Sequence, residues 1–191
     1  MRLLGIEKIR DGKYLKGYEL SYENKAGKVK KFEIISRNEL KSPADLGQKI
    51  SGTSIVAFRG EKLLLLKEFR LGVNREIYNL CAGMLEEGES IEECIARELY
   101  EETGLSVKRI ISILPPSFSA VGFSDVKTYI AFVEAEGSFE YHTSANEQIE
   151  ASFYTRQEVY ELLRSKEFSS RAQMAAYLFA AGADPHNLPE L

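Results

Sequence analysis

The chain has few of the residues that build thiolate metal sites and disulfide frameworks. Its 191 residues include only two cysteines, Cys81 and Cys94, and two histidines, His142 and His186. The cysteines are not in a Cys-x-x-Cys arrangement and have no paired histidines, so the sequence predicts neither a zinc site nor a disulfide framework. We expect both cysteines to be reduced core residues. A mechanism based on either histidine is disfavoured, because one lies in a polar loop and the other in a proline-flanked tail.

The sequence also lacks a long hydrophobic run and an excess of positive charge. Its run of four leucines at 63–66 is too short to cross a bilayer, and the N-terminus carries no hydrophobic signal region. The formal net charge of -4 argues against a general nucleic-acid binder, which would show a basic stripe. We therefore expect a cytoplasmic protein with no membrane or nucleic-acid partner. A polyanionic substrate would then need local arginines and a metal ion.

The composition is that of a globular enzyme, with 44% hydrophobic and 28% charged residues. Two β-rich runs, Tyr14–Tyr22 and Val29–Ile35, flank a turn near Asn24–Gly27 and predict a hairpin. Because an isolated hairpin is marginally stable in water, it must pack on the main domain or on a second copy of the chain. We divide the chain into an N-terminal β region, residues 1–50, and a main domain, residues 51–191.

In the main domain, the sequence predicts a mixture of strands and helices. Ser54–Phe69 predicts two strands that turn at Gly60 and Glu61, and their near-continuous apolar runs indicate a sheet buried on both faces by helices. The fold class is therefore α/β (α+β). The remaining expected elements are strands near Ile110–Leu114, Lys127–Val133 and Ala151–Tyr154, and helices near Arg156–Leu163 and Ser169–Ala181.

The most informative segment is a helix expected at Ile91–Thr103, which carries acids on its inward face. Ser90 followed by Glu93 forms a capping-box signature, and Gly104 is a typical helix stop. Glu98 and Glu102 fall within the same arc as the apolar side chains. Glu98, Glu101 and Glu102 are three and four residues apart and can converge on one point.

Carboxylates in a buried stripe repel one another unless a positive charge lies between them. Ligands with only oxygen donors suit Mg²⁺ or Mn²⁺ better than zinc. Arg97 points to another side of the helix, where it would brace Glu89 or a nearby loop through a bidentate pair. The alternative is a solvated acidic helix, which is what most charge runs form. The position of two acids inside the apolar arc argues against that alternative.

The segment from Gly83 to Leu105 resembles the Nudix box, G-x5-E-x7-R-E-U-x-E-E-x-G-U, where U is a bulky aliphatic residue. All nine fixed positions are filled, by Gly83, Glu89, Arg97, Glu98, Leu99, Glu101, Glu102, Gly104 and Leu105. The resemblance implies a Nudix-type α/β/α sandwich with a mixed sheet. It also implies an Mg²⁺-dependent hydrolase, with Mn²⁺ as an alternative, that cleaves a nucleoside diphosphate linked to another moiety.

Carried over by position, the resemblance implies a metal site made by Glu98, Glu102, Glu101 and the backbone carbonyl of Ala82. Glu98 and Glu102 would be the main ligands, and Glu89 would lie at the edge of the site. The metal would neutralise the diphosphate and lower the pKa of a bound water.

Upstream of the box, the chain resembles the ADP-ribose pyrophosphatase branch of the family. Arg70 stands where that branch has an arginine, and it is our candidate for binding a substrate phosphate. Arg37 is a second candidate, and Arg75 is a third without a distinguishing argument. Tyr18 and Phe123 are candidates for stacking on the base. For each of these residues an ordinary surface or core role is the alternative.

Several positions depart from the pattern of that branch. The proline expected sixteen residues beyond the box is Val121, and the glutamate of the same patch is Val126. Asn79 and Cys81 replace a glutamate and a proline before the box. The layout is closest to the ADP-ribose branch, but another nucleoside diphosphate sugar or a dinucleotide stays open as substrate.

A general base is expected in the loop before the last strand, where related enzymes carry an acidic segment. Glu147 is our choice because Glu147-Gln148-Ile149 matches an E-x-I pattern. Glu150 is the reserve, and Glu140 is a further alternative.

The N-terminal strands resemble those that ADP-ribose pyrophosphatases commonly exchange in a dimer, so the resemblance implies a homodimer. A non-catalytic sensor of nucleotide sugars is the alternative to an enzyme. The intact box favours the enzyme.

Overall fold

The computed structural model describes residues 1–140, 148–184 and 187. The chain forms two compact units. The first contains Met1–Ser51 and Pro116–Thr128, and the second contains Gly52–Pro115 and Tyr129–Leu191. Residues 116–128 thus belong with the N-terminal strands, whereas our sequence boundaries placed them in the domain at 51–191.

The first unit is built on a three-stranded antiparallel sheet in the order β1-β2-β3. Strands β2 (Lys16–Glu23) and β3 (Val29–Ser36) are the predicted hairpin. Strand β1 (Arg2–Asp11) was not predicted, because its mostly exposed residues show no clear alternation of apolar and polar side chains. A 3-10 helix, η1, follows at Pro43–Asp45.

A small core in the first unit is centred on Tyr18, which is fully buried together with Leu20, Ile34 and Leu40. The Tyr18 hydroxyl accepts a hydrogen bond from the Leu40 backbone N–H at 2.9 Å and lies 3.3 Å from the Asn38 carbonyl, to which it donates. A buried tyrosine needs such partners for its hydroxyl group. Tyr18 therefore has a structural role in this unit.

The second unit contains most of a seven-stranded sheet with the path β10-β5-β4-β9-β8, on which β6 pairs with β5 and β7 pairs with β4. The predicted strands are all present, and most are longer than expected at one or both ends. Their bounds are β4 Ile50–Arg59, β5 Lys62–Arg70, β6 Arg75–Asn79, β7 Cys81–Met84, β8 Ser106–Phe118, β9 Lys127–Glu136 and β10 Ile149–Tyr154.

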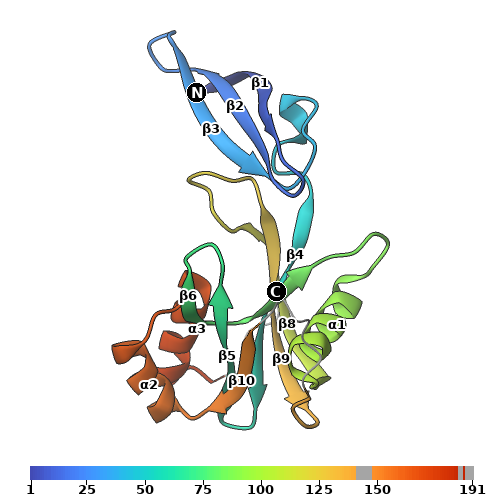
Figure 1. Ribbon diagram of the computed structural model, residues 1–191, viewed down its shortest axis with the longest axis vertical. Helices are drawn as coiled ribbons and strands as arrows, with labels where there is room; N and C mark the ends of the chain where they lie inside the picture. The colour runs from blue at the N-terminus through green and yellow to red at the C-terminus, as the bar shows by residue number, and fades with distance from the viewer. Residues whose placement is uncertain (141–147, 185–186, 188–191) are drawn as a thin grey trace. The chain divides into compact units, whose positions relative to one another are not determined.

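Helices cover both faces of this sheet, as Figure 1 shows, with α1 on one side and α2 and α3 on the other. Their bounds are α1 Ile91–Thr103, α2 Arg156–Ser165 and α3 Ser170–Ala180. In β5, Leu64 and Leu66 pack in the core that contains residues of α1, whereas Leu63 and Leu65 pack in the core that contains residues of α2 and α3. This alternation confirms the predicted α/β/α sandwich, because a strand buried on both faces has apolar residues at consecutive positions.

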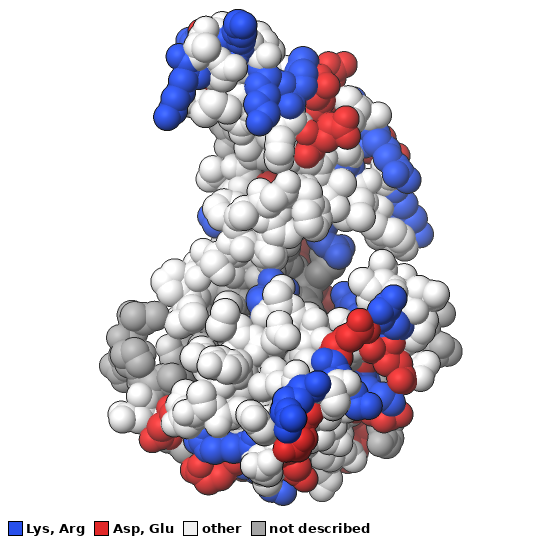
Figure 2. All heavy atoms as spheres, turned by 90° about the vertical axis from the view of Figure 1, so that its left-hand side faces the viewer, with Lys and Arg blue, Asp and Glu red and all other residues white. Residues whose placement is uncertain are grey.

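The described residues contain no helix that is long and apolar enough to cross a membrane. Cys81 and Cys94 are both buried and free, as the sequence predicted. On the face drawn in Figure 2, acidic and basic side chains are intermixed in the lower part of the view, whereas basic side chains predominate in the upper part.

Candidate active site

Helix α1 has the bounds that the sequence predicted, because both of its ends are determined locally. The Ser90 side chain accepts a hydrogen bond from the Glu93 N–H, and the Glu93 carboxylate accepts one from the Ser90 N–H at 2.8 Å. Gly104 ends the helix with φ 76°, in the left-handed region that favours glycine. These caps set the register that turns Glu98 inward.

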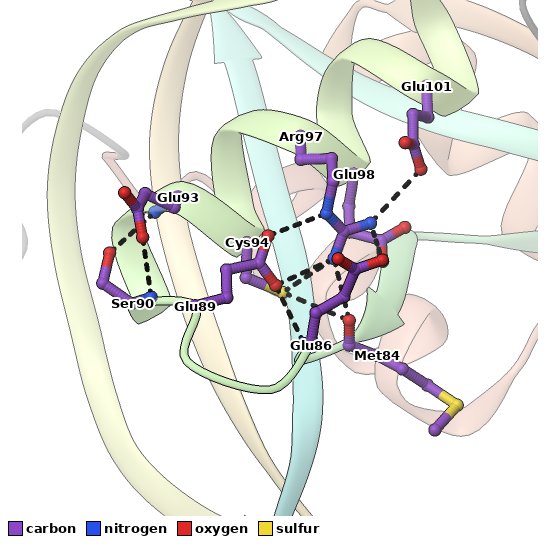
Figure 3. Close-up of polar contacts among 9 residues, drawn as sticks. All are labelled: Met84, Glu86, Glu89, Ser90, Glu93, Cys94, Arg97, Glu98 and Glu101. Atoms are coloured by element: carbon purple, nitrogen blue, oxygen red, sulfur yellow. Dashed lines mark hydrogen bonds and ion pairs between the residues drawn. The ribbon is translucent and has the colours of Figure 1, made fainter.

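Arg97 is the centre of an ion-pair network (Figure 3). Its Nε and Nη2 donate to the two carboxylate oxygens of Glu89, at 2.7 and 3.0 Å. Its Nη1 donates to Glu98 at 2.8 Å and to Glu101 at 3.2 Å, and its Nη2 also donates to the Met84 carbonyl at 2.9 Å. This bidentate pair confirms the predicted brace, and it lowers the pKa of Glu89 to about 2.

The Glu98 carboxylate occupies the space that a side chain at position 83 would fill. A Cβ atom added to Gly83 would lie 1.7 Å from the Glu98 Cδ atom. Glu98 is 9% exposed, and this burial raises its pKa, although Arg97 opposes the shift. The glycine at the start of the box is therefore needed so that β7 can lie directly against this carboxylate.

Glu102 lies one helical turn further along α1, next to the same strand. Its carboxylate accepts a hydrogen bond from the Ala82 N–H at 3.1 Å. Burial, opposed by the Ala82 hydrogen bond and assisted by the charges of Glu68 and Glu98, raises the pKa of Glu102 to about 8. Two carboxylates one helical turn apart, both largely shielded from water, favour the binding of a cation near them.

The donor set fits a divalent cation that prefers oxygen, since the Glu98 carboxylate is buried, that of Glu102 is half-buried, and both lie next to β7. Glu101 is more exposed and is turned toward Arg97. Within the described residues, no three histidine, cysteine, aspartate or glutamate side chains are gathered as a preformed metal site. The set Ala82, Glu98, Glu101 and Glu102 therefore stays a prediction.

Arg70 and Glu102 line one cavity, of about 330 Å³, together with Ala82. The Arg70 side chain is 57% exposed, and its guanidinium lies 3.4 Å from the Glu68 carboxylate. Arg75 instead pairs with Glu167 at 3.0 Å. Of these two arginines, the structure brings only Arg70 to the cavity that holds a box glutamate.

The structure adds Glu68, which our sequence reasoning did not single out. This residue is 6% exposed and lines the same cavity. Its carboxylate accepts a hydrogen bond from the Asn79 amide at 2.5 Å, and Asn79 accepts one from the Ser169 hydroxyl at 2.5 Å. The available signal was its spacing: Glu68 follows Leu64 and Leu66 at alternate positions of β5, on the face toward α1.

Our candidate general bases have different outcomes. Glu147, our first choice, lies outside the described residues. Glu150 is paired with Lys67, the two charged atoms being 3.7 Å apart. Because Ile149 and Ala151 pack in the core toward α1, Glu150 points to the opposite face of β10, away from the box glutamates. The reserve assignment of Glu150 is therefore wrong, since alternation along a strand separates it from the site.

Arg37 and Phe123 belong to the first unit. Arg37 directly follows β3, and Phe123 lies in the segment Pro116–Thr128. The Phe123 ring is 57% exposed, while its backbone carbonyl accepts a hydrogen bond from the Ile35 N–H at 2.8 Å. Their roles in substrate binding stay predictions.

The chain matches a known protein family. The NUDIX domain family matches residues 49–178, which is more than half of the chain and includes the whole box. The chain belongs to the Nudix family. It is a Nudix hydrolase, and such hydrolases generally use divalent metal ions.

Two ADP-ribose pyrophosphatases are among its relatives. The protein of Bacillus subtilis (strain 168) is 29% identical over 169 residues, which cover 87% of this chain and 84% of that protein. The protein of Saccharomyces cerevisiae is 29% identical over 148 residues, covering 76% and 63% of the two chains. The NAD-capped RNA hydrolase NudC of Vibrio parahaemolyticus is 48% identical, but only over 56 residues, 21% of its length.

A solved structure supports the fold assignment. The crystal structure of an ADP compounds hydrolase superposes with a TM-score of 0.75 and covers 93% of this chain and 92% of its own. Its sequence identity of 18% means that this likeness concerns the Nudix fold alone.

Proposed function

We propose that this Nudix hydrolase cleaves the pyrophosphate bond of ADP-ribose, giving AMP and ribose 5-phosphate, with Mg²⁺ as its cofactor. The observation that carries the proposal is the similarity to the Bacillus subtilis ADP-ribose pyrophosphatase along 87% of the chain. The cavity supports it, because Glu102 and an arginine line the same space. A diphosphate needs both a cation site and a fixed donor of hydrogen bonds.

Glu98 and Glu102 would hold the cation, with Glu101 joining them after release from Arg97. The cation supplies charge neutralisation on the diphosphate and a more acidic water. The chain's own contribution is to keep these carboxylates in place: Arg97 binds Glu98 from one side, and the close approach of Gly83 confines it from the other. Glu89 in turn orients Arg97.

Arg70 would bind a phosphate oxygen and stabilise the charge that develops during attack on phosphorus. Its side chain lines the cavity and is 57% exposed, so its donors can reach a substrate. Glu68 holds Arg70 from behind and is itself held by Asn79. Glu147 is the proposed group that takes a proton from the attacking water.

The test is an assay of ADP-ribose with Mg²⁺, with products followed by phosphorus NMR. We expect AMP and ribose 5-phosphate from the wild type and a fall in kcat of about 100-fold or more in Glu102→Gln, because loss of a metal ligand removes several kcal/mol of transition-state stabilisation. Glu92→Gln is the matched control, because it is the same substitution at an exposed position in the first turn of the same helix. Equal activity of Glu102→Gln and Glu92→Gln would refute the assignment of Glu102.

The same assay distinguishes the other substrates that the sequence leaves open. GDP-mannose, UDP-sugars and dinucleotides are offered at equal concentration, and a higher kcat/KM for one of them replaces ADP-ribose as the substrate. Calorimetry covers the sensor alternative: tight ADP-ribose binding with no turnover at any Mg²⁺ or Mn²⁺ concentration contradicts the enzyme proposal.

We also propose that the protein is a cytoplasmic homodimer. Exposed apolar side chains of the first unit support the dimer, among them Ile9, Tyr14, Leu15 and Val29. Two buried free cysteines agree with a reducing compartment. Sedimentation velocity at micromolar concentration tests the dimer, and a monomer mass at all concentrations contradicts it.

A further inference from the structure

The first unit contains a cavity, open to solvent, that has no role in the proposed reaction. It has a volume of about 250 Å³ and lies between the β2–β3 hairpin and the segment Pro116–Thr128. Three aromatic side chains line it, Tyr22, Phe32 and Phe118, and Val121 contributes to its wall. Phe118 is 50% exposed and Val121 is 75% exposed, so an apolar surface leads into the cavity from solvent.

A buried carboxylate also lines this cavity. Asp125 is 6% exposed, and one of its oxygens, Oδ2, accepts a hydrogen bond from the Gly47 N–H at 3.2 Å. The other oxygen, Oδ1, is buried and has no hydrogen-bond partner among the residues that the structure describes. Buried polar atoms are nearly always paired, so an unpaired carboxylate oxygen in a cavity wall indicates a missing donor.

Neighbouring side chains do not supply that donor. The Ser124 hydroxyl accepts a hydrogen bond from the Val126 N–H at 3.3 Å. The Lys127 ammonium lies over the Phe118 ring, 5.3 Å from its centroid, and within the described part of the chain it makes no hydrogen bond to Asp125 Oδ1. Because Lys127 already places a positive charge on this ring, a neutral donor suits the cavity better than a second cation.

We propose that this cavity is a binding site for a neutral, planar ring that carries an N–H group. The N–H would donate to Asp125 Oδ1, and the ring would pack against Phe118 and its aromatic neighbours. Pockets for drug-sized ligands have volumes of roughly 300–1,000 Å³, so a cavity of this size fits one or two fused rings. The site lies wholly within the first unit and goes beyond the proposed hydrolysis.

Indole and benzothiophene are a matched pair of probes, since the two bicyclic rings have similar shape and only indole carries an N–H. Binding to the full chain is measured by ligand-observed NMR and calorimetry. We expect indole to bind at least about tenfold more tightly, as one charge-assisted hydrogen bond implies. Equal binding of the two rings, or no binding of indole at millimolar concentration, would overturn the proposal.

Asp125→Asn tests the acceptor directly. The amide oxygen can keep the hydrogen bond from Gly47, which turns the amide NH2 group toward the cavity, where it repels an N–H donor. We expect indole to lose its tenfold preference in this variant, while benzothiophene binding stays the same. Indole binding that survives Asp125→Asn but disappears in Glu102→Gln would place the probe in the catalytic cavity and overturn the proposal.

A second variant keeps the test valid if Asp125→Asn does not fold. Val121→Trp adds bulk at an exposed position of the cavity wall, where the fold tolerates it. We expect this variant to bind neither ring. Val121→Ala is its control and should still bind indole. Sedimentation of each variant without ligand is the final check. A shift of the monomer–dimer equilibrium with no effect on indole would show that a second copy of the chain fills the cavity, which also overturns the proposal.

Discussion

Replacement of Gly83 by alanine tests how closely strand β7 approaches the Glu98 carboxylate. The added Cβ atom would lie 1.7 Å from the Glu98 Cδ atom and 1.9 Å from each of its oxygens, far inside van der Waals contact. The backbone of Gly83 is paired with Thr53 on β4, so the strand cannot easily withdraw. We therefore expect the Glu98 side chain to move.

The cost of this movement follows from the contact that is lost. Glu98 accepts a hydrogen bond from Arg97 at 2.8 Å, and a hydrogen bond between charged groups contributes about 1.5–3 kcal/mol. The Arg97 side chain is 25% exposed and keeps its ion pair with Glu89, so the free energy lost with the Glu98 contact is near the lower end of that range. We expect Gly83→Ala to lower the free energy of unfolding by about 1–2 kcal/mol. Hydrolysis should fall by about 100-fold, because the carboxylate leaves its position.

The assay is a double-mutant cycle in urea, followed by far-ultraviolet circular dichroism in the presence of EDTA. In the Glu98→Ala background the Gly83→Ala change meets no carboxylate, so it should cost less than about 0.5 kcal/mol. The coupling free energy between the two positions is then about 0.5–2 kcal/mol. If Gly83→Ala is equally destabilising with and without the Glu98 carboxylate, the cause is backbone strain and our reasoning is wrong.

Three further predictions concern charged groups around the same site. In the metal-free protein, burial raises the pKa of Glu102 from 4.5 to about 8. The protonated Glu102 therefore stabilises the fold fully below pH 4.5, and this stabilisation is lost as the pH rises toward 8. The melting temperature measured in EDTA should fall over this pH range, and it should fall less in Glu102→Gln. Arg97→Lys cannot form the bidentate pair with Glu89 and should lower the free energy of unfolding by about 1–3 kcal/mol in urea titrations, whereas unchanged stability would mean that the pair is only a surface contact. Glu68→Gln keeps the hydrogen bond to Asn79 but removes the charge that pairs with Arg70. Steady-state kinetics should therefore show the KM for the substrate rising about threefold to tenfold, with kcat nearly unchanged. A large fall in kcat alone would contradict this positioning role.

The accuracy of the sequence-based predictions differs from one element to another. Helix α1 was predicted to the residue, because Ser90 and Gly104 mark its ends and its period marks its buried face. Strand β1 was missed, because its exposed residues leave no pattern of alternation. Our second candidate for the general base, Glu150, was wrong for a different reason. Its closeness in sequence to Glu147 does not determine the face of β10 on which its side chain lies.

What the sequence determined by itself was local: the caps of α1, the inward register of Glu98 and Glu102, and the reach of Arg97 to Glu89 within eight residues. Such contacts depend on helix geometry, which a motif of 23 residues specifies. Only the tertiary structure decided which distant groups meet, because those contacts depend on how strands pair and pack. The Gly47–Asp125 hydrogen bond joins residues 78 positions apart, and the contact from Ser169 to Asn79 spans 90 positions, distances over which no periodicity in the sequence extends.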